Sequence, residues 1–153
     1  MIRCDWAQPG LEAIGRDAAV VIVDVFSFGT AVTLAVERGA IVYPWPGAAA
    51  GAADFARRRN AILCTDRSRT TFEDWLGAGA VLASLGGEQS SEARAAAAVF
   101  AASRAGLTEI LAGSVSGREL ASRGFAGDVA LAGDYDSSFV VPVVDRDGWL
   151  VAI

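Results

Sequence analysis

Asp24 stands where an open α/β sheet would place a ligand, directly after the apolar run Ala18–Val23. Ligands of such sheets bind beyond the carboxyl ends of the strands. An Asp there can hold Mg²⁺, and the N-terminus of the helix that follows can hold a phosphate group. The position therefore indicates a combined cation and anion site. The alternative interpretation is that Asp24 caps the next turn or pairs with an arginine.

Two further carboxylates, Glu73 and Asp74, occupy the first turn of a predicted helix. They could serve as metal ligands or as a general base. Because Thr70 and Thr71 stand three residues before them, the pattern also fits a capping box with charges that suit the helix dipole. Pattern alone favours capping.

Arg118 lies at the start of another predicted helix, within Ser116–Glu119. A positive charge there opposes the helix dipole, and a bound anion would remove that conflict. The alternative is an exposed arginine without a ligand. Asp134 and Asp136, on either side of Tyr135, could bind a metal or lie in a solvated loop.

The sequence contains no histidine, which excludes Ser-His-Asp and Cys-His catalysis and His-liganded zinc. Cys4 and Cys64 form neither a metal-binding pattern nor a disulfide framework, so we expect two free thiols in a reducing, cytoplasmic setting. Cys64 could be a nucleophile, but no His or Lys is present to activate it, and an inert thiol fits better.

Composition narrows the class of protein further. The chain has 153 residues, of which 53% are hydrophobic, and this suits one domain, residues 1–153, with one core. A net charge of −5 argues against a nucleic-acid partner. The longest apolar run ends at Asp24 and is too short to span a membrane. Because the chain is acidic overall, any anion site must draw on local arginines or backbone N–H groups.

The first half of the sequence reads as alternating strands and helices after an irregular start, with a Pro9-Gly10 turn. Unbroken apolar runs are typical of parallel strands covered on both faces. Ser27 or Thr30 could cap the first helix, which Gly39 ends. The expected strands are Ala18–Val23, Ile41–Tyr43 and Ala61–Cys64, and the expected helices run to Arg38 and over Ala48–Arg59. This order predicts a doubly wound, mostly parallel sheet with helices on both faces.

The second half is helical and ends in a hairpin. Ala78, Gly79 and Ala80 give the first of its helices a face that allows close packing. The expected helices are Phe72–Leu85, Glu92–Ser103, Leu107–Leu111, and one from Ser116 that Gly124 ends. Asp147-Gly148 predicts a β-hairpin turn between the apolar run Phe139–Val144 and a return strand, Trp149–Ile153.

Three stretches together resemble the 2-phosphosulfolactate phosphatase family. The segment Val20–Val32 is similar to the family's strand, Asp-Val pair and hydroxyl-rich turn, and Cys4–Trp6 resembles the start of its actinobacterial-type branch. Phe72–Ala80 resembles the Glu-Asp-x-x-x-Ala-Gly-Ala helix. Ser116–Leu120, followed by further matches up to Val143, resembles the C-terminal part. The resemblance identifies a shortened member, because the family's central segment is missing near residues 66–71.

Family members are Mg²⁺-dependent enzymes that hydrolyse 2-phosphosulfolactate to sulfolactate and phosphate in coenzyme M biosynthesis. The resemblance implies catalytic roles for Asp24, Glu73 and Asp74, with Asp24 and Glu73 as metal ligands. It places Ser27 and Thr30 near the phosphate group and Arg118 at anionic substrate groups.

The expected partner is therefore a small anionic phosphate ester. The alternative is a catalytically inactive remnant that binds small anions or another protein. Sheet edges exposed by the missing segment would favour a homodimer.

Overall fold

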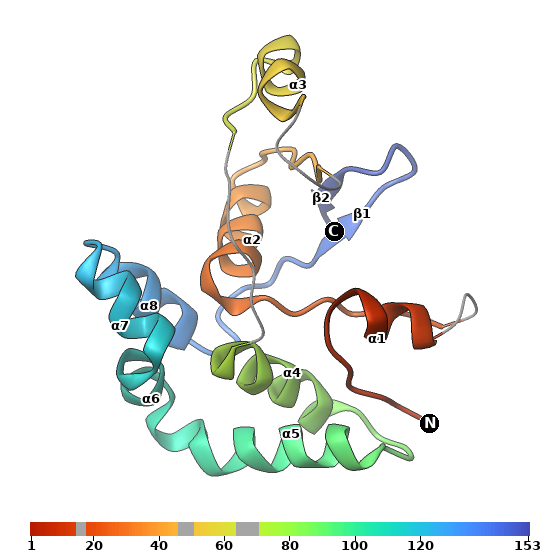
Figure 1. The fold of residues 1–153 in the computed structure, drawn as a ribbon, viewed down its shortest axis with the longest axis vertical. Coiled ribbons are helices and arrows are strands. Elements are labelled where there is room, and N and C mark those ends of the chain that lie inside the picture. The colour runs from red at the N-terminus through yellow and green to blue at the C-terminus, as the bar shows by residue number, and fades with distance from the viewer. Residues whose placement is uncertain (15–17, 46–50, 64–70) are drawn as a thin grey trace. The chain divides into compact units, whose positions relative to one another are not determined.

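The structure, a computed structural model, describes residues 1–14, 18–45, 51–63 and 71–153. The described chain is rich in helix and forms two compact units. Unit 1 comprises Met1–Thr30 and Arg69–Ser137, and unit 2 comprises Ala31–Ser68 and Ser138–Ile153 (Figure 1). The single-domain organisation stays a prediction.

Unit 1 consists of helices and short helical turns. Its elements are α1 (Ala7–Ile14), the π-helical turn η1 (Val25–Gly29), α4 (Phe72–Ser84), α5 (Ser91–Ser103), the 3₁₀ turn η2 (Arg104–Gly106), α6 (Leu107–Gly113), α7 (Val115–Ser122) and α8 (Ala126–Gly133). The predicted helices α4, α5 and α6 are confirmed to within two residues at each end. Helix α1 replaces the irregular start that we expected, because Pro9 stands in its first turn, where proline is tolerated.

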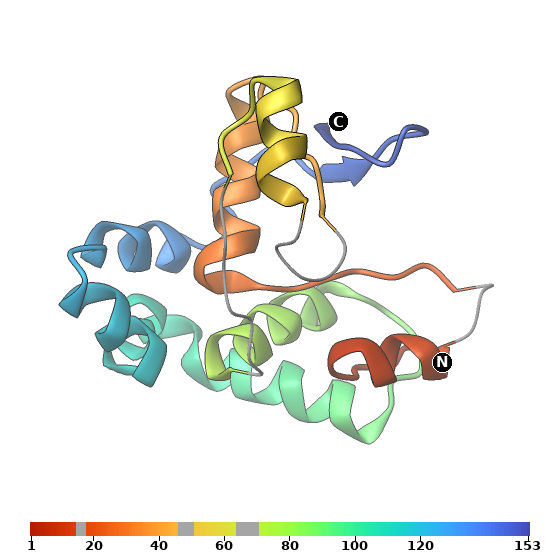
Figure 2. The same cartoon turned by 45° about the horizontal axis from the view of Figure 1, so that its top comes forward.

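Helices α4 and α5 lie side by side in both views of the ribbon (Figures 1 and 2). A β-carbon added to Gly79 would overlap the carbonyl oxygen of Ala96 and lie 2.8 Å from Cβ of Phe100. The predicted small-residue face of α4 is therefore the face that meets α5. Ser90 caps α5, and its hydroxyl accepts a hydrogen bond from the Ala93 N–H at 3.2 Å.

The core of unit 1 lies where α4 and α5 meet the three short helices α6–α8. Its buried members come from all five of these helices: Leu76, Phe100, Leu107, Leu111, Leu120 and Val129. A β-carbon on Gly117 of α7 would overlap the Leu111 carbonyl oxygen, so glycine allows the close approach of α7 to the end of α6. Helix α7 begins earlier than we expected, because its N-cap is Ser114 and not Ser116.

The helical stretch Ser91–Gly113 is 23 residues long and contains an 18-residue window with a mean hydropathy of 1.3. By length and composition it could cross a membrane, but core helices of soluble proteins meet the same criterion. Its residues Phe100, Leu107 and Leu111 pack in the core described above. Packing within unit 1 therefore covers part of this stretch, of whose apolar window 28% is buried.

Unit 2 contains the rest of α2 (Thr30–Glu37), together with α3 (Ala52–Arg59), β1 (Pro142–Val144) and β2 (Leu150–Ala152). The two strands form an antiparallel hairpin in which Val143 pairs with Val151. The predicted C-terminal hairpin is confirmed, with a shorter return strand than expected. Gly39 has a φ of +78° just after α2, as predicted for its C-terminal end.

An aromatic cluster joins α3 to the hairpin in unit 2. The ring of Tyr43 meets those of Phe55 and Trp149 edge-on, with centroids 5.7 and 4.7 Å apart. The Arg59 guanidinium lies 5.3 to 5.4 Å from all three ring centroids. Arg59 is exposed, and its cation also lies over three aromatic faces of this cluster.

The predicted parallel sheet is not formed by the described residues. The segment Ala18–Val23 is not assigned to a strand, and Val21 and Ile22 are 68% and 82% exposed. Parallel pairing among the described residues is limited to a single bridge between Ile2 and Gln89. An apolar run becomes a strand only when a neighbouring strand pairs with its backbone, and no described segment pairs with this one.

Candidate functional site

The Asp74 carboxylate joins the two acidic motifs of unit 1. Its Oδ1 accepts a hydrogen bond from the Val25 N–H at 2.8 Å, and its Oδ2 accepts one from the Thr71 hydroxyl at 2.9 Å. Thr71 is the N-cap residue of α4, as the capping pattern predicted. Its hydroxyl does not cap a backbone N–H and instead holds the side chain of Asp74. The carboxylate therefore stands between the start of α4 and the residue after Asp24.

The turn from Asp24 to Thr30 is held by its own backbone. The Asp24 carbonyl accepts a hydrogen bond from the Gly29 N–H at 2.8 Å, and the Val25 carbonyl accepts one from the Thr30 hydroxyl at 2.9 Å. A β-carbon at position 29 would overlap the Asp24 carbonyl oxygen, so the turn requires glycine there. Thr30 starts α2 and ties the turn to that helix.

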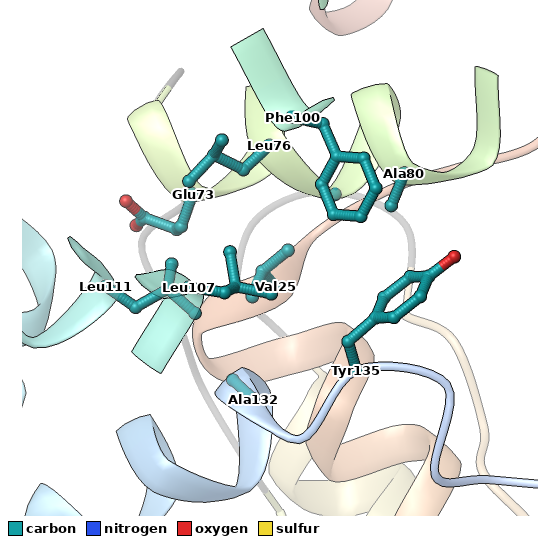
Figure 3. A pocket seen from close by; sticks show the side chains of 10 residues that line it. Val25, Glu73, Leu76, Ala80, Phe100, Leu107, Leu111, Ala132 and Tyr135 are labelled. Carbon is teal, nitrogen blue, oxygen red and sulfur yellow. The ribbon is translucent and has the colours of Figure 1, made fainter. Parts of the chain in front are cut away.

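Glu73 is 1% exposed, and its Oε1 has no hydrogen-bond partner among the described residues. The residue lines a cavity of about 70 Å³ whose other walls are apolar or aromatic (Figure 3). These walls are Val25, Leu76, Gly77, Ala80, Phe100, Leu107, Leu111, Ala132 and Tyr135. A buried carboxylate oxygen without a partner is costly, so Glu73 is the residue of this site most in need of a ligand.

Gly77 brings α4 close to the chain on either side of Asp24. A β-carbon there would lie 2.7 Å from Cγ2 of Val25 and 2.8 Å from Cγ1 of Val23. The glycine thus lets Asp74 reach the Val25 N–H. Sequence reasoning missed both Gly29 and Gly77, which lie within the segments Val20–Val32 and Phe72–Ala80 that carry the family resemblance.

The other predicted site residues are not shown to contact Asp24, Glu73 or Asp74. Arg118 donates a hydrogen bond to the Gly113 carbonyl at the end of α6 and does not line the cavity. The backbone of Ser27 lies within η1, but its side chain is outside the described part of the chain, as is all of Cys64. Asp134 and Asp136 are exposed just after α8.

Carboxylates are the groups of this site that could hold a divalent cation. Mg²⁺ prefers oxygen ligands and is commonly held by one or two carboxylates, with water and substrate phosphate completing its shell. Asp24 and Glu73 can supply two such groups, and the unpartnered Oε1 of Glu73 fits a cation. The described residues do not contain a group of three or more potential His, Cys, Asp or Glu ligands. The described residues therefore do not show a metal site, and Mg²⁺ binding stays a prediction.

Unit 1 is thus a helical unit in which the Asp24 turn lies next to the Glu73-Asp74 turn of α4. Comparison with known families then identifies it further. A model of the 2-phosphosulpholactate phosphatase family matches residues 47–147, and the chain belongs to that family. The matched range includes Glu73, Asp74 and Arg118, whereas Asp24 precedes it. Neither a curated protein nor a solved structure matches the chain significantly.

Proposed function

We propose that the protein is a Mg²⁺-dependent phosphatase that hydrolyses 2-phosphosulfolactate, or a similar small anionic phosphate ester, to the alcohol and phosphate. Family membership supports a phosphatase. The observation that carries the proposal is the hydrogen bond from the Val25 N–H to Asp74 Oδ1. It brings the Asp24 motif next to the Glu73-Asp74 motif, although the two are far apart in the sequence. For the family substrate, the reaction would belong to coenzyme M biosynthesis.

In this proposal Asp24 and Glu73 hold Mg²⁺ through their carboxylates. The cation, when bound, neutralises charge on the phosphate oxygens and orients the attacking water. Ser27 and Thr30 lie in the turn that would face the phosphate group. Arg118 would bind anionic groups of the substrate, and its exposed contact with the Gly113 carbonyl can be exchanged for such a group.

Phosphate release from 2-phosphosulfolactate by the folded protein, with Mg²⁺ or with EDTA, tests the proposal. We expect release that requires Mg²⁺ and is lost in Asp24→Asn. Asp128→Asn is the matched control, because Asp128 is exposed in the first turn of α8. Release that is equal in both variants, or that persists in EDTA, would contradict the proposed site.

A second candidate function is binding of a small anion without turnover. Its support is that several groups of the site are already engaged within the chain. Both oxygens of Asp74 accept hydrogen bonds, and Thr30 and Arg118 donate to carbonyl groups. Isothermal titration calorimetry with sulfolactate and phosphate distinguishes anion binding from catalysis. The binding function predicts that the folded protein binds these anions but releases no phosphate from 2-phosphosulfolactate.

A further inference from the structure

We infer that Asp74, held by Thr71, is a positioning residue that fixes the peptide unit between Asp24 and Val25, and that it does not itself contact substrate or metal. This inference rests on the proposed function and assigns Asp74 a role different from the catalytic one predicted from sequence. It adds Thr71 to the residues on which the site depends.

The peptide unit between Asp24 and Val25 is held at both of its polar groups. Its carbonyl oxygen, from Asp24, accepts the Gly29 N–H at 2.8 Å. Its N–H, from Val25, donates to Asp74 Oδ1 at 2.8 Å. A peptide unit is planar, so fixing both groups fixes the plane from which the Asp24 side chain departs. The Cα atom of Asp24, which lies in this plane and carries the side chain, is thereby held in place.

The Asp74 side chain is itself fixed. Thr71 donates its hydroxyl to Oδ2 at 2.9 Å, while Oδ1 takes the Val25 N–H. Thr71 is half-buried and is the N-cap residue of α4. Hydrogen bonds to a carboxylate are stronger than those between neutral groups, and two of them in opposite directions hold the group firmly.

Glu73 precedes Asp74, and its side chain lines the apolar cavity (Figure 3). The two adjacent carboxylates of α4 therefore have different roles. Glu73 offers an unpartnered oxygen to a ligand, whereas Asp74 uses its two oxygens to align the turn that carries Asp24.

The test compares five variants. Thr71→Val removes the hydroxyl and keeps the shape, and Thr71→Ser restores it. Asp74→Asn keeps an oxygen that can accept the Val25 N–H, and Asp74→Ala removes it. The matched control is Ser84→Ala, which deletes an exposed hydroxyl at the other end of α4, where it donates to the Val81 carbonyl.

The first measurement is hydrogen exchange of the Val25 amide by NMR. We expect exchange to rise about tenfold in Thr71→Val and Asp74→Ala, and to change by less than about twofold in Thr71→Ser and Ser84→Ala. Unchanged exchange in both Thr71→Val and Asp74→Ala overturns the inference. Amide exchange does not depend on turnover. It therefore tests whether Asp74 and Thr71 hold the Val25 amide even if the wild-type protein releases no phosphate and the proposed function fails.

The second measurement separates positioning from direct contact. A positioning role predicts that Asp74→Asn keeps most of the wild-type kcat, while Asp74→Ala lowers kcat and raises the Mg²⁺ concentration needed for half activity about tenfold or more. Thr71→Ser should restore the activity that Thr71→Val loses. If Asp74→Asn is as inactive as Asp74→Ala while its Val25 amide stays protected, Asp74 contacts metal or substrate and the inference is wrong.

Discussion

Gly79 of α4 faces the carbonyl oxygen of Ala96 in α5 with no room for a side chain between them. Gly79→Ala should therefore lower the free energy of unfolding by about 2 kcal/mol or more, because overpacking outweighs the better helix propensity of alanine. Gly127→Ala is the control, since nothing lies within 4 Å of a β-carbon there in α8. We expect it to be neutral or slightly stabilising. Equal urea midpoints for the two variants would show that α4 and α5 do not approach so closely.

Glu73→Leu should stabilise the protein and remove its function. It replaces a buried oxygen that lacks a partner among the described residues, and we expect a gain of about 1–3 kcal/mol in unfolding free energy. Mg²⁺ should raise the melting temperature of wild type and leave that of Glu73→Leu unchanged. Glu109→Leu, at an exposed position of α6, should show no such gain. A Glu73→Leu variant that is less stable than wild type would mean that the carboxylate has a partner in solution.

Arg59→Ala should destabilise unit 2 by about 1 kcal/mol, because it removes a cation from three aromatic faces. Arg58→Ala deletes the neighbouring exposed arginine and should be neutral. Near-UV circular dichroism reports on Tyr43 and Trp149, so we also expect Arg59→Ala to change that signal. Identical spectra and melting curves for the two variants would contradict the cluster.

Cys4 should be a slow nucleophile. Burial raises the pKa of its thiol, and the negative charges of Asp5 and Glu92 act in the same direction. Since the thiolate reacts, alkylation by iodoacetamide in a Cys64→Ser variant should be slower than in the urea-unfolded chain at about pH 8, with the difference closing as pH rises. By linkage, the raised pKa adds stability below the pKa of the unfolded thiol and loses it as pH rises through the folded value. Equal rates at about pH 8 would refute the shift.

Helices were predictable from sequence where local signals agreed. Thr71 before Phe72 and Ser90 before Ser91 are residues of the types that cap helices, and a helix begins directly after each of them. The Asp147-Gly148 turn likewise indicated the hairpin correctly, because Gly148 has the positive φ that such a turn needs. These elements depend on a few consecutive residues.

Features that depend on distant partners were not predictable in the same way. The run Ala18–Val23 has the composition of a buried strand, but pairing is a property of two segments, and no described segment pairs with it. At the site, sequence identified Glu73 and Asp74 as carboxylates of one helical turn. It could not distinguish the cavity-facing Glu73 from Asp74, which bonds to Val25, because that difference depends on what the rest of unit 1 places beside each residue.

Unit 1 is assembled from two pieces of chain that are separated by residues 31–68. During synthesis the Asp24 turn leaves the ribosome well before α4 exists, and the bond from Val25 to Asp74 closes a gap of 49 positions. Helices α4–α8 follow one another directly and can associate through short loops, which is fast, whereas closing the long gap carries a larger entropy cost. We expect the helical piece to fold first and the Asp24 turn to dock last, so the site would mature after the scaffold that carries it.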